Sequence, residues 1–190
     1  MATFADKPTI EGERIILRPL QSDDADALLA AMENGDSMRL TGTHATFTLE
    51  QLEAWVTSRP LQDDRLDLAI IDRVSGAFVG DLAINEWDAD NQSCNFRIAL
   101  TPAGQNRGIG TEATRLIVGY VFEHLPIHRI SLDVYAFNPR AAHVYTTVGF
   151  VVEGRARHTL LWDGTFHDSV LMSILRPDWE ADRAARTLRP

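Results

Sequence analysis

One amphipathic helix stands between two strand-like segments, and this order limits the folds open to the chain. Residues 110–124 carry apolar side chains at helical spacing, and these fall on one face: Ala113, Leu116, Ile117, Tyr120 and Val121. Residues 95–100 before this helix and 129–136 after it have the pattern of strands. A helix with one apolar face between two strands packs against the sheet that the strands form. The segment therefore predicts an α/β arrangement.

The rest of the chain continues this alternation. Further strands are expected at residues 14–20, 66–72, 77–87, 150–155 and 166–175, and further helices at 22–34, 48–59 and 138–148. Ser22 is expected to start the first helix and Gly35 to end it. The order predicts an α/β fold with a mixed, mostly antiparallel central sheet of about seven strands flanked by helices. No repeat or linker divides the chain, so we expect one domain over residues 1–190, with its core at about 12–179 and an irregular tail after Glu180.

Composition limits the classes of partner. The 190 residues have a formal net charge of −9 and a pI near 5.0, which disfavours a nucleic-acid binder and suits a cationic substrate. No apolar run is long enough to cross a bilayer, and residues 1–11 lack the features of a signal peptide. Cys94 is the one cysteine, so an internal disulfide is excluded, and its strand-like setting indicates a buried, inert thiol. We expect a cytoplasmic protein that binds neither nucleic acid nor membrane.

The segment from Leu100 to Ala113 has the features of an anion site. A strand ends, a short loop follows, and Gly108 and Gly110 lead into the helix. The first amides of a helix have no partners within it, and the helix dipole makes that end partly positive. Glycine allows a bulky anion to approach the backbone, so this site suits a pyrophosphate. Arg107, next to these amides, is expected to add charge-assisted contacts.

Two other interpretations compete with this one. Residues 108–113 also satisfy the dinucleotide fingerprint G-x-G-x-x-G/A, although residues 101–107 separate its first glycine from the strand. Asp133 also falls inside the next predicted strand, whereas a ribose-binding acid stands at a strand end. A glycine-rich turn at the start of an ordinary helix is the second interpretation. No Gly-Lys-Ser/Thr follows, which excludes a P-loop.

Three motifs stand in order along the chain. Gln105-x-x-Gly108-x-Gly110 resembles the acetyl-CoA pyrophosphate loop of the GCN5-related N-acetyltransferases (GNAT superfamily) in every defined position. The segment from Asn138 to Tyr145, closed by Gly149-Phe150, resembles the N-x-x-A/S-x-x-x-Y segment of the same family. Residues further along resemble the RimJ/RimL-like branch: Glu153-Gly154, Trp162-Asp163-Gly164, Asp168 and Pro177-Asp178-Trp179, together with Leu17-Arg18-Pro19 near the start. The resemblance runs from about Gly12 to Trp179 and implies the acyl-CoA N-acyltransferase fold.

The resemblance also implies a donor site for acetyl-CoA and no metal. Main-chain groups of Ile98, Ala99 and Leu100 would pair with the pantetheine arm where two strands separate, as a peptide adds to a sheet edge. The pyrophosphate would lie on the loop that follows Gln105, against the amides of Arg107, Gly108, Ile109, Gly110 and Thr111. The Asn138 side chain would contact the pantetheine region, and as a residue before Pro139 it would also cap a helix.

Tyr145 is expected to be the general acid, because a phenol can donate a proton to the sulfur that leaves when an amine attacks a thioester. The general base stays open. Many RimJ/RimL-like chains have a glutamate in the strand before the loop, but Asn95 stands at that position here and cannot accept a proton. Asp81, Glu86 and His158 are alternatives.

The resemblance implies an N-acetyltransferase whose acceptor is a primary amine, either a protein N-terminus or a small molecule. The alternative is a non-catalytic acyl-CoA-binding module on the same scaffold, which Asn95 supports and Tyr145 opposes. Trp55, Trp87 and Trp162 are candidates for an acceptor pocket, with core packing as the alternative. The resemblance leaves a homodimer open.

Overall fold

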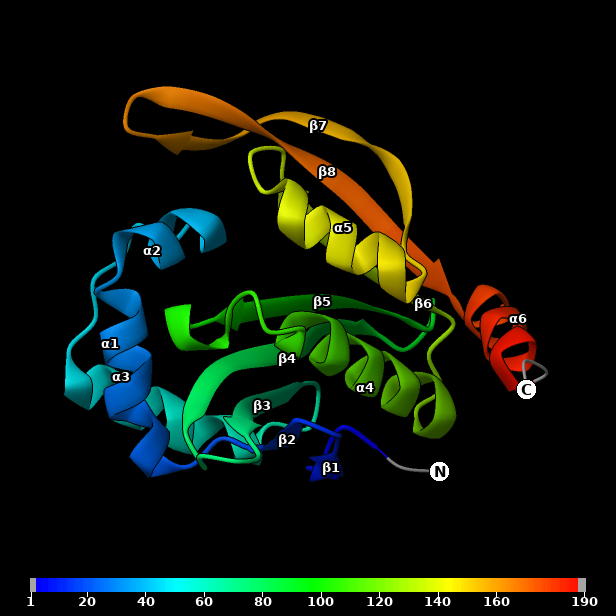
Figure 1. The fold of residues 1–190 in the computed structure, drawn as a ribbon, viewed down its shortest axis with the longest axis horizontal. Coiled ribbons are helices and arrows are strands. Elements are labelled where there is room, and N and C mark those ends of the chain that lie inside the picture. Colours follow the sequence, from blue (N-terminus) through cyan, green and yellow to red (C-terminus); the bar gives the residue numbers. More distant parts are fainter. Residues whose placement is uncertain (1–2, 188–190) are drawn as a thin grey trace.

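The computed structural model describes residues 3–187, which form one eight-stranded sheet with helices on both faces (Figure 1). The strands are β1 (Ile10–Glu11), β2 (Ile15–Pro19), β3 (Leu66–Asp72), β4 (Phe78–Asp88), β5 (Ser93–Leu100), β6 (Arg129–Tyr135), β7 (Val151–Trp162) and β8 (Thr165–Leu175). Their order in the sheet is β1-β2-β3-β4-β5-β6-β8-β7. Only β5 and β6 pair in parallel; the other neighbours in this described sheet are antiparallel. The mixed, mostly antiparallel sheet is confirmed, with the two-residue β1 as an additional strand too short to show alternation.

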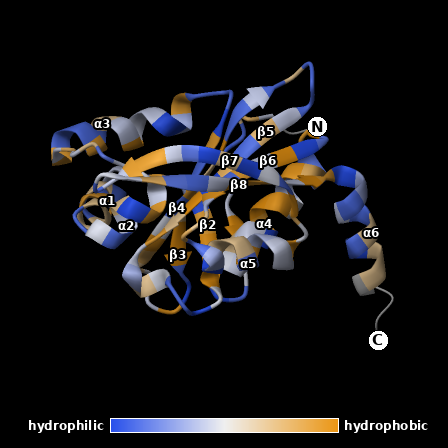
Figure 2. Ribbon diagram, turned by 90° about the horizontal axis from the view of Figure 1, so that it is seen from above, coloured by the Kyte–Doolittle hydropathy of each residue, from blue (hydrophilic) through white to orange (hydrophobic). Residues whose placement is uncertain are grey.

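The helices divide between the two faces of the sheet. They are α1 (Ala25–Met32), α2 (Gly35–Thr41), α3 (Leu49–Ser58), α4 (Ile109–His124), α5 (Pro139–Val148) and α6 (Arg176–Thr187). α4 and α5 share the larger core cluster with β2 to β6, whereas α1 and α3 share a smaller cluster with β3. The hydrophobic colouring in Figure 2 gathers accordingly in the central strands and in α4.

Strand β3 shows how one segment serves both cores. All seven of its residues are buried. Leu68 and Ile70 belong to the cluster under α4, and the alternate residues Ala69 and Ile71 belong to the cluster under α1 and α3. Burial of each large aliphatic side chain stabilises the fold by about 1.5–3 kcal/mol.

Polar side chains define where the predicted helices begin. The Thr48 hydroxyl accepts from the Gln51 amide while the Gln51 side chain accepts from the Thr48 amide, so a capping box starts α3. Asn138 Oδ1 accepts from the Ala141 amide at 3.1 Å and starts α5. Gly149 ends α5 with a φ of +115°, a backbone conformation that favours glycine.

Three expectations about elements were wrong. Gly35 does not end the first helix; it begins α2, because Asn34 Oδ1 accepts from the Ser37 amide at 3.0 Å and caps a separate helix. Residues 181–187 are not irregular but continue α6, a predominantly polar helix. Trp179 packs on Phe122 with ring centroids 5.6 Å apart and holds α6 in place. Strand β7 extends to Trp162, beyond the predicted end at 155. The prediction stopped too early because the mostly exposed residues of this strand show no alternation of apolar and polar side chains.

None of the helices within residues 3–187 combines the length and the apolar composition that a bilayer span requires.

Candidate active site

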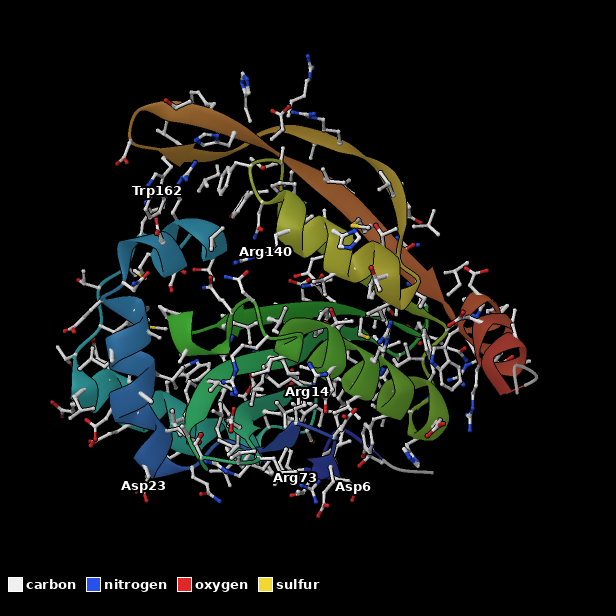
Figure 3. The ribbon with its side chains drawn as sticks, in the orientation of Figure 1. Asp6, Arg14, Asp23, Arg73, Arg140 and Trp162 are labelled. Carbon is white, nitrogen blue, oxygen red and sulfur yellow. The ribbon has the colours of Figure 1, made fainter. Side chains whose placement is uncertain are left out.

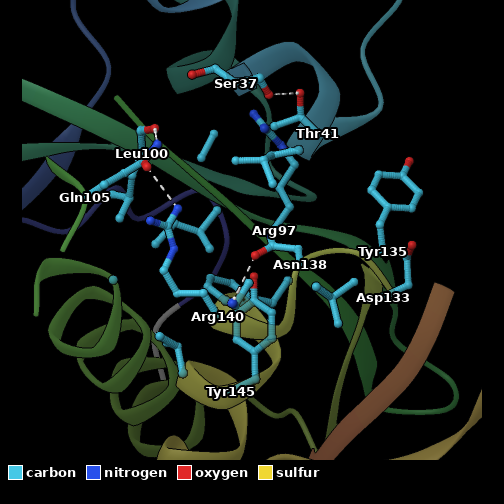
Figure 4. A pocket seen from close by; sticks show the side chains of 18 of the residues that line it. Ser37, Thr41, Arg97, Leu100, Gln105, Asp133, Tyr135, Asn138, Arg140 and Tyr145 are labelled. Atoms are coloured by element: carbon cyan, nitrogen blue, oxygen red, sulfur yellow. Dashed lines mark hydrogen bonds between the residues drawn. The ribbon is translucent and has the colours of Figure 1, made fainter. Parts of the chain in front are cut away.

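The candidate site is a cleft between β5 and β6, which run side by side only briefly. Their parallel pairing covers Ser93 to Asn95 on β5, and beyond Asn95 the two strands separate. A cavity of about 670 Å³ opens there, between the sheet, α2, the start of α4 and the start of α5 (Figure 4). Its walls include the β5 residues Asn95, Phe96, Arg97, Ile98, Ala99 and Leu100.

The second edge of β5 is open along this cleft. From Phe96 to Leu100, β5 pairs with β4 on one side, in a register that places Leu82 opposite Ile98 and Gly80 opposite Leu100. The other side has no strand partner in the described sheet, because β6 has already diverged. Ile98, Ala99 and Leu100 therefore present a strand edge to the cleft, as the sequence predicted, and an extended amide-bearing chain can pair with such an edge.

The loop of residues 105–110, called the glycine loop below, places the start of α4 at the same cleft. Gly108 is the N-cap residue with a φ of +75°, and no side chain caps the helix. The first amide of α4 that donates to a main-chain carbonyl of the helix is that of Glu112, which donates to the Gly108 carbonyl at 3.1 Å. The amides of residues 109–111 therefore point out of the helix end, toward an anion. Gly110 lies so close to Leu100 that a Cβ there would come within 3.3 Å of Leu100 Cδ1.

The sheet resolves one of the competing interpretations. A dinucleotide fold has a parallel, doubly wound sheet, whereas this sheet is mostly antiparallel. Asp133 lies inside β6 and lines the cleft. The dinucleotide interpretation is therefore excluded.

Two predicted residues turn their side chains elsewhere. The Arg107 guanidinium donates to Asp72 Oδ2 at 2.6 Å and to the Ala103 carbonyl at 3.2 Å, and it does not line the cleft. The Asp72 carboxylate thus holds the guanidinium, and the charge-assisted contact from Arg107 to an anion stays a prediction. Ile109 is 2% exposed and packs in the core, so only its backbone faces the helix end.

Asp72 is strongly held as an anion. The Ser75 amide and the Arg107 guanidinium donate to it, as do the Ser75 hydroxyl and the Val74 amide, and together they lower the pKa of Asp72 to about 2. The carboxylate thus ties the glycine loop to the turn between β3 and β4.

Arg140 was not among the predicted residues. It extends from the first turn of α5 and donates to Gln105 Oε1 at 2.9 Å and to Asn106 Oδ1 at 3.1 Å, while Gln105 Nε2 donates to the Leu100 carbonyl (Figure 4). Both partners of Arg140 are neutral, so its positive charge stays uncompensated beside the start of α4. The sequence signal was available: Arg140 stands two residues after Asn138.

Tyr145 enters the cleft from α5 with its ring packed in the core. The ring meets Phe96 edge-on at a centroid distance of 6.2 Å and Phe150 at 5.9 Å. Burial, and to a smaller degree the charge of Asp133, raises the pKa of Tyr145 above its usual value, so the phenol keeps its proton. Its hydroxyl has no hydrogen-bond partner within residues 3–187 and lies at the cavity that Tyr145 lines. Asn138 also lines this cavity while capping α5.

Of the carboxylates proposed as a base, Glu86 lines the cleft and Asp81 does not. Asp81 is buried beneath Arg97, which donates to it at 2.7 Å. His158 lies in the β7–β8 hairpin, stacked on Phe166 at 5.2 Å. Asp133, which the sequence did not single out as a base, does line the cleft and accepts from the Ser169 hydroxyl at 3.3 Å.

Asn95 lines the cleft, and its amide donates to Asn85 Oδ1 at 3.3 Å. The three tryptophans proposed for an acceptor pocket line no part of it. Trp87 packs on Phe4, Trp55 lies under Arg59, and Trp162, the last residue of β7, stacks on His44 (Figure 3).

Cys94 is buried, and burial raises the pKa of its thiol to about 12, so it is not a nucleophile. The residues that the structure describes contain no group of three or more histidine, cysteine or acidic side chains that would hold a metal ion.

Comparisons with known proteins agree with this geometry. Residues 14–151 match the acetyltransferase (GNAT) domain family. The spermidine N(1)-acetyltransferase of Escherichia coli (strain K12) is 26% identical over 170 residues, covering 87% of this chain and 88% of that protein. The ribosomal protein uS5-alanine N-acetyltransferase of the same strain is 31% identical over 91 residues, covering 48% of this chain and 47% of that protein.

Solved structures share the fold. The spermidine N-acetyltransferase from Vibrio cholerae, in complex with CoA and spermine, has a TM-score of 0.82 at 23% identity and covers 89% of this chain and 99% of its own. These relatives are acetyltransferases, which favours the catalytic interpretation over the non-catalytic module. With a family match over most of its length and the same fold, the chain belongs to the acetyltransferase (GNAT) family and is an N-acetyltransferase.

Proposed function

We propose that this enzyme binds acetyl-CoA in the cleft between β5 and β6 and transfers the acetyl group directly to a primary amine in a ternary complex. One observation carries the proposal. The open edge of β5, the uncapped start of α4 and the hydroxyl of Tyr145 meet in a single cavity.

Each part of the cleft suits one part of the donor. The strand edge at Ile98, Ala99 and Leu100 offers main-chain groups to the two amides of a pantetheine arm. The amides at the start of α4 suit the pyrophosphate, and Arg140 adds a positive charge next to them. Asn138, which lines the cavity, contacts the pantetheine region in this arrangement.

The chemistry needs three proton transfers. The ammonium form of the acceptor loses one proton, and its nitrogen then bonds to the thioester carbonyl carbon. The carbon–sulfur bond breaks, the nitrogen loses a second proton, and the sulfur leaves with a proton. The products are the N-acetyl amine, CoA with a free thiol, and one released proton. Tyr145, a buried phenol that keeps its proton, donates to the sulfur in this proposal.

Asp133 is the proposed acceptor of the amine proton, directly or through one water molecule. It lines the cleft, and its charge adds to the effect of burial in raising the pKa of Tyr145. Asn95, at the position of the family's usual glutamate, contributes a hydrogen bond instead of a base.

The relatives suggest the acceptor class and the setting. Their names include spermidine and ribosomal protein acetyltransferases, so both small amines and protein N-termini fit the family. We infer membership of the RimJ/RimL-like branch from residues 153–179, and with it action in the cytoplasm.

Calorimetric titration with acetyl-CoA, with NAD as a parallel control, tests the donor site. We expect saturable binding of acetyl-CoA, no binding of NAD, and loss of acetyl-CoA binding when Gly108 and Gly110 are replaced by valine. If acetyl-CoA does not bind the folded wild-type protein, the proposed donor site is wrong.

A further inference from the structure

Arg97 places a positive charge in the part of the cleft that faces away from the core under α4, which we call the acceptor half. Strand alternation separates the β5 side chains: Phe96, Ile98 and Leu100 turn toward the core under α4, and Asn95, Arg97 and Ala99 turn to the opposite face. The donor phosphates belong at the start of α4, on the core side. In Figure 4 the Arg97 side chain extends toward Ser37 and Thr41 of α2, away from Tyr145. Arg97 is therefore positioned to meet the acceptor.

One hydrogen bond fixes the Arg97 guanidinium and leaves its other N–H donors available to a ligand. Arg97 Nη2 donates to Asp81 Oδ2 at 2.7 Å, and the Asp81 side chain is only 9% exposed. The Arg97 side chain is 40% exposed, and its remaining nitrogens have no hydrogen-bond partner among the described residues. A guanidinium fixed by a buried carboxylate on one edge keeps its other donors free for a ligand.

The surroundings of Arg97 suit an anion. Asn85 and Asn95 also line the cavity, and although Asn95 already donates one N–H to Asn85 Oδ1, both side-chain amides keep N–H groups that can donate to a ligand. Asp133 of β6 also lines the cavity. In the register of Asn95 with Ser131, it stands two positions further along β6, as Arg97 does along β5. Glu86 supplies a second carboxylate at the bulge of β4. The cavity around Arg97 thus holds one guanidinium and two carboxylates.

On the basis of the proposed function, we propose that the acceptor is a small zwitterionic amine: an α-amino acid, or a close analogue of one, whose carboxylate pairs with Arg97 while its ammonium group faces Asp133 and Glu86. The reaction is the acetyl transfer written above, with the amino group of the amino acid as the nucleophile. A polyamine is disfavoured, because its second cationic group would meet the Arg97 guanidinium.

Matched acceptors test the carboxylate. The full-length protein is assayed with the common α-amino acids, their amides, their decarboxylated amines and spermidine, with CoA thiol release as the readout. We expect at least one amino acid to exceed its own amide and its own decarboxylated amine by tenfold or more in kcat/KM. The amide has more free amine at a given pH, so this preference cannot arise from protonation.

Variants test Arg97 itself. Arg97→Gln is expected to reduce the ratio of kcat/KM for acid over amide at least tenfold, Arg97→Lys to restore part of it, and both to keep the wild-type affinity for acetyl-CoA. The ratio is measured within each variant, so a loss of folded protein cancels. Arg157→Gln, the same change at an exposed β7 residue outside the cleft, should leave the ratio unchanged.

Several results would overturn the inference while leaving the proposed function intact. They are equal acetylation of amides or decarboxylated amines, a preference for spermidine or for peptide N-termini, an unchanged ratio in Arg97→Gln, and acetyl-CoA binding with no amino acid acetylated. Failure of acetyl-CoA to bind at all would instead remove the proposed function.

Discussion

Arg107 and Asp72 join two loops that are far apart in sequence, through a hydrogen-bonded ion pair of 2.6 Å between Nη2 and Oδ2. The pair connects the loop before α4 to the turn after β3, and Asp72 also accepts from the amides of that turn. The ion pair between Arg107 and Asp72 thus supports the glycine loop from outside the cleft, because neither residue lines the cavity.

Asp72→Asn tests this support. We expect the variant to bind acetyl-CoA several-fold more weakly, because the loop that presents the helix amides loses its anchor. A calorimetric affinity equal to that of the wild type would show that the loop holds its shape without the pair. Glu153→Gln removes a comparable surface ion pair, with Arg129, outside the cleft and serves as the control.

The same pair predicts a pH dependence. The pKa of Asp72 falls from 3.8 to about 2 in the folded protein, so its stabilisation is complete above the unfolded value and disappears as the pH falls from about 4 toward 2. Urea unfolding of the wild type should therefore lose stability over this range faster than unfolding of Asp72→Asn. Parallel pH profiles for the two proteins would contradict the assignment.

Tyr145→Phe separates chemistry from binding. The variant keeps the packing of the ring against Phe96 and Phe150 but loses the proton donor. We expect kcat to fall by about 10²-fold or more, with acetyl-CoA affinity unchanged. Because the pKa of Tyr145 is raised, the wild type should show no alkaline loss of activity from this phenol at pH 9. Wild-type turnover in the variant would exclude Tyr145 as the general acid.

Asp133→Asn and Glu86→Gln, assayed side by side, identify the proton acceptor. If Asp133 accepts the amine proton, its variant should lose at least about tenfold in kcat, and the loss should shrink at high pH, where the amine is already neutral. Glu86→Gln should change mainly KM for the acceptor. The reverse outcome would assign the base to Glu86.

Two glycines of one segment should respond oppositely to alanine. Gly108 has a φ of +75°, and an added Cβ would come within 2.8 Å of Arg14 Nη1, so Gly108→Ala should destabilise the protein and weaken donor binding. Gly119 lies inside α4 with no atom within 4 Å of an added Cβ. Gly119→Ala should raise the free energy of unfolding by about 0.5–1 kcal/mol. Thermal unfolding of the two variants checks both signs.

Much of the fold and the donor half of the site was predictable because the signals are local. The capping box at Thr48, the apolar run of β3 and the motif from Gln105 to Gly110 each lie within a few residues. The resemblance to the family pointed to Tyr145 and Asn138, and both line the cleft. Element α6 was missed because its contact with Phe122 is tertiary and its own residues are polar.

The hydrogen-bond partners of long side chains were harder to predict, because those partners are distant in the sequence. Arg107 turns to a carboxylate 35 positions away, and Arg97 is fixed by one 16 positions away. Asp133 looked like an ordinary strand residue until the divergence of β5 and β6 exposed it to the cleft. Divergence of two strands has no signature in the residues of either strand alone.

The divergence of β5 and β6 has a consequence for the stability of the folded protein. Only three residue pairs join β5 to β6, so the ladder between the two portions of the sheet, β1 to β5 and β6 to β8, is short. A donor bound along the open edge of β5 and in contact with Asn138 and Tyr145 would connect the two portions of the sheet. Ligand at 100 times its dissociation constant adds about 2.7 kcal/mol to the free energy of unfolding. The lifetime of the folded chain would then rise and fall with the supply of its own substrate.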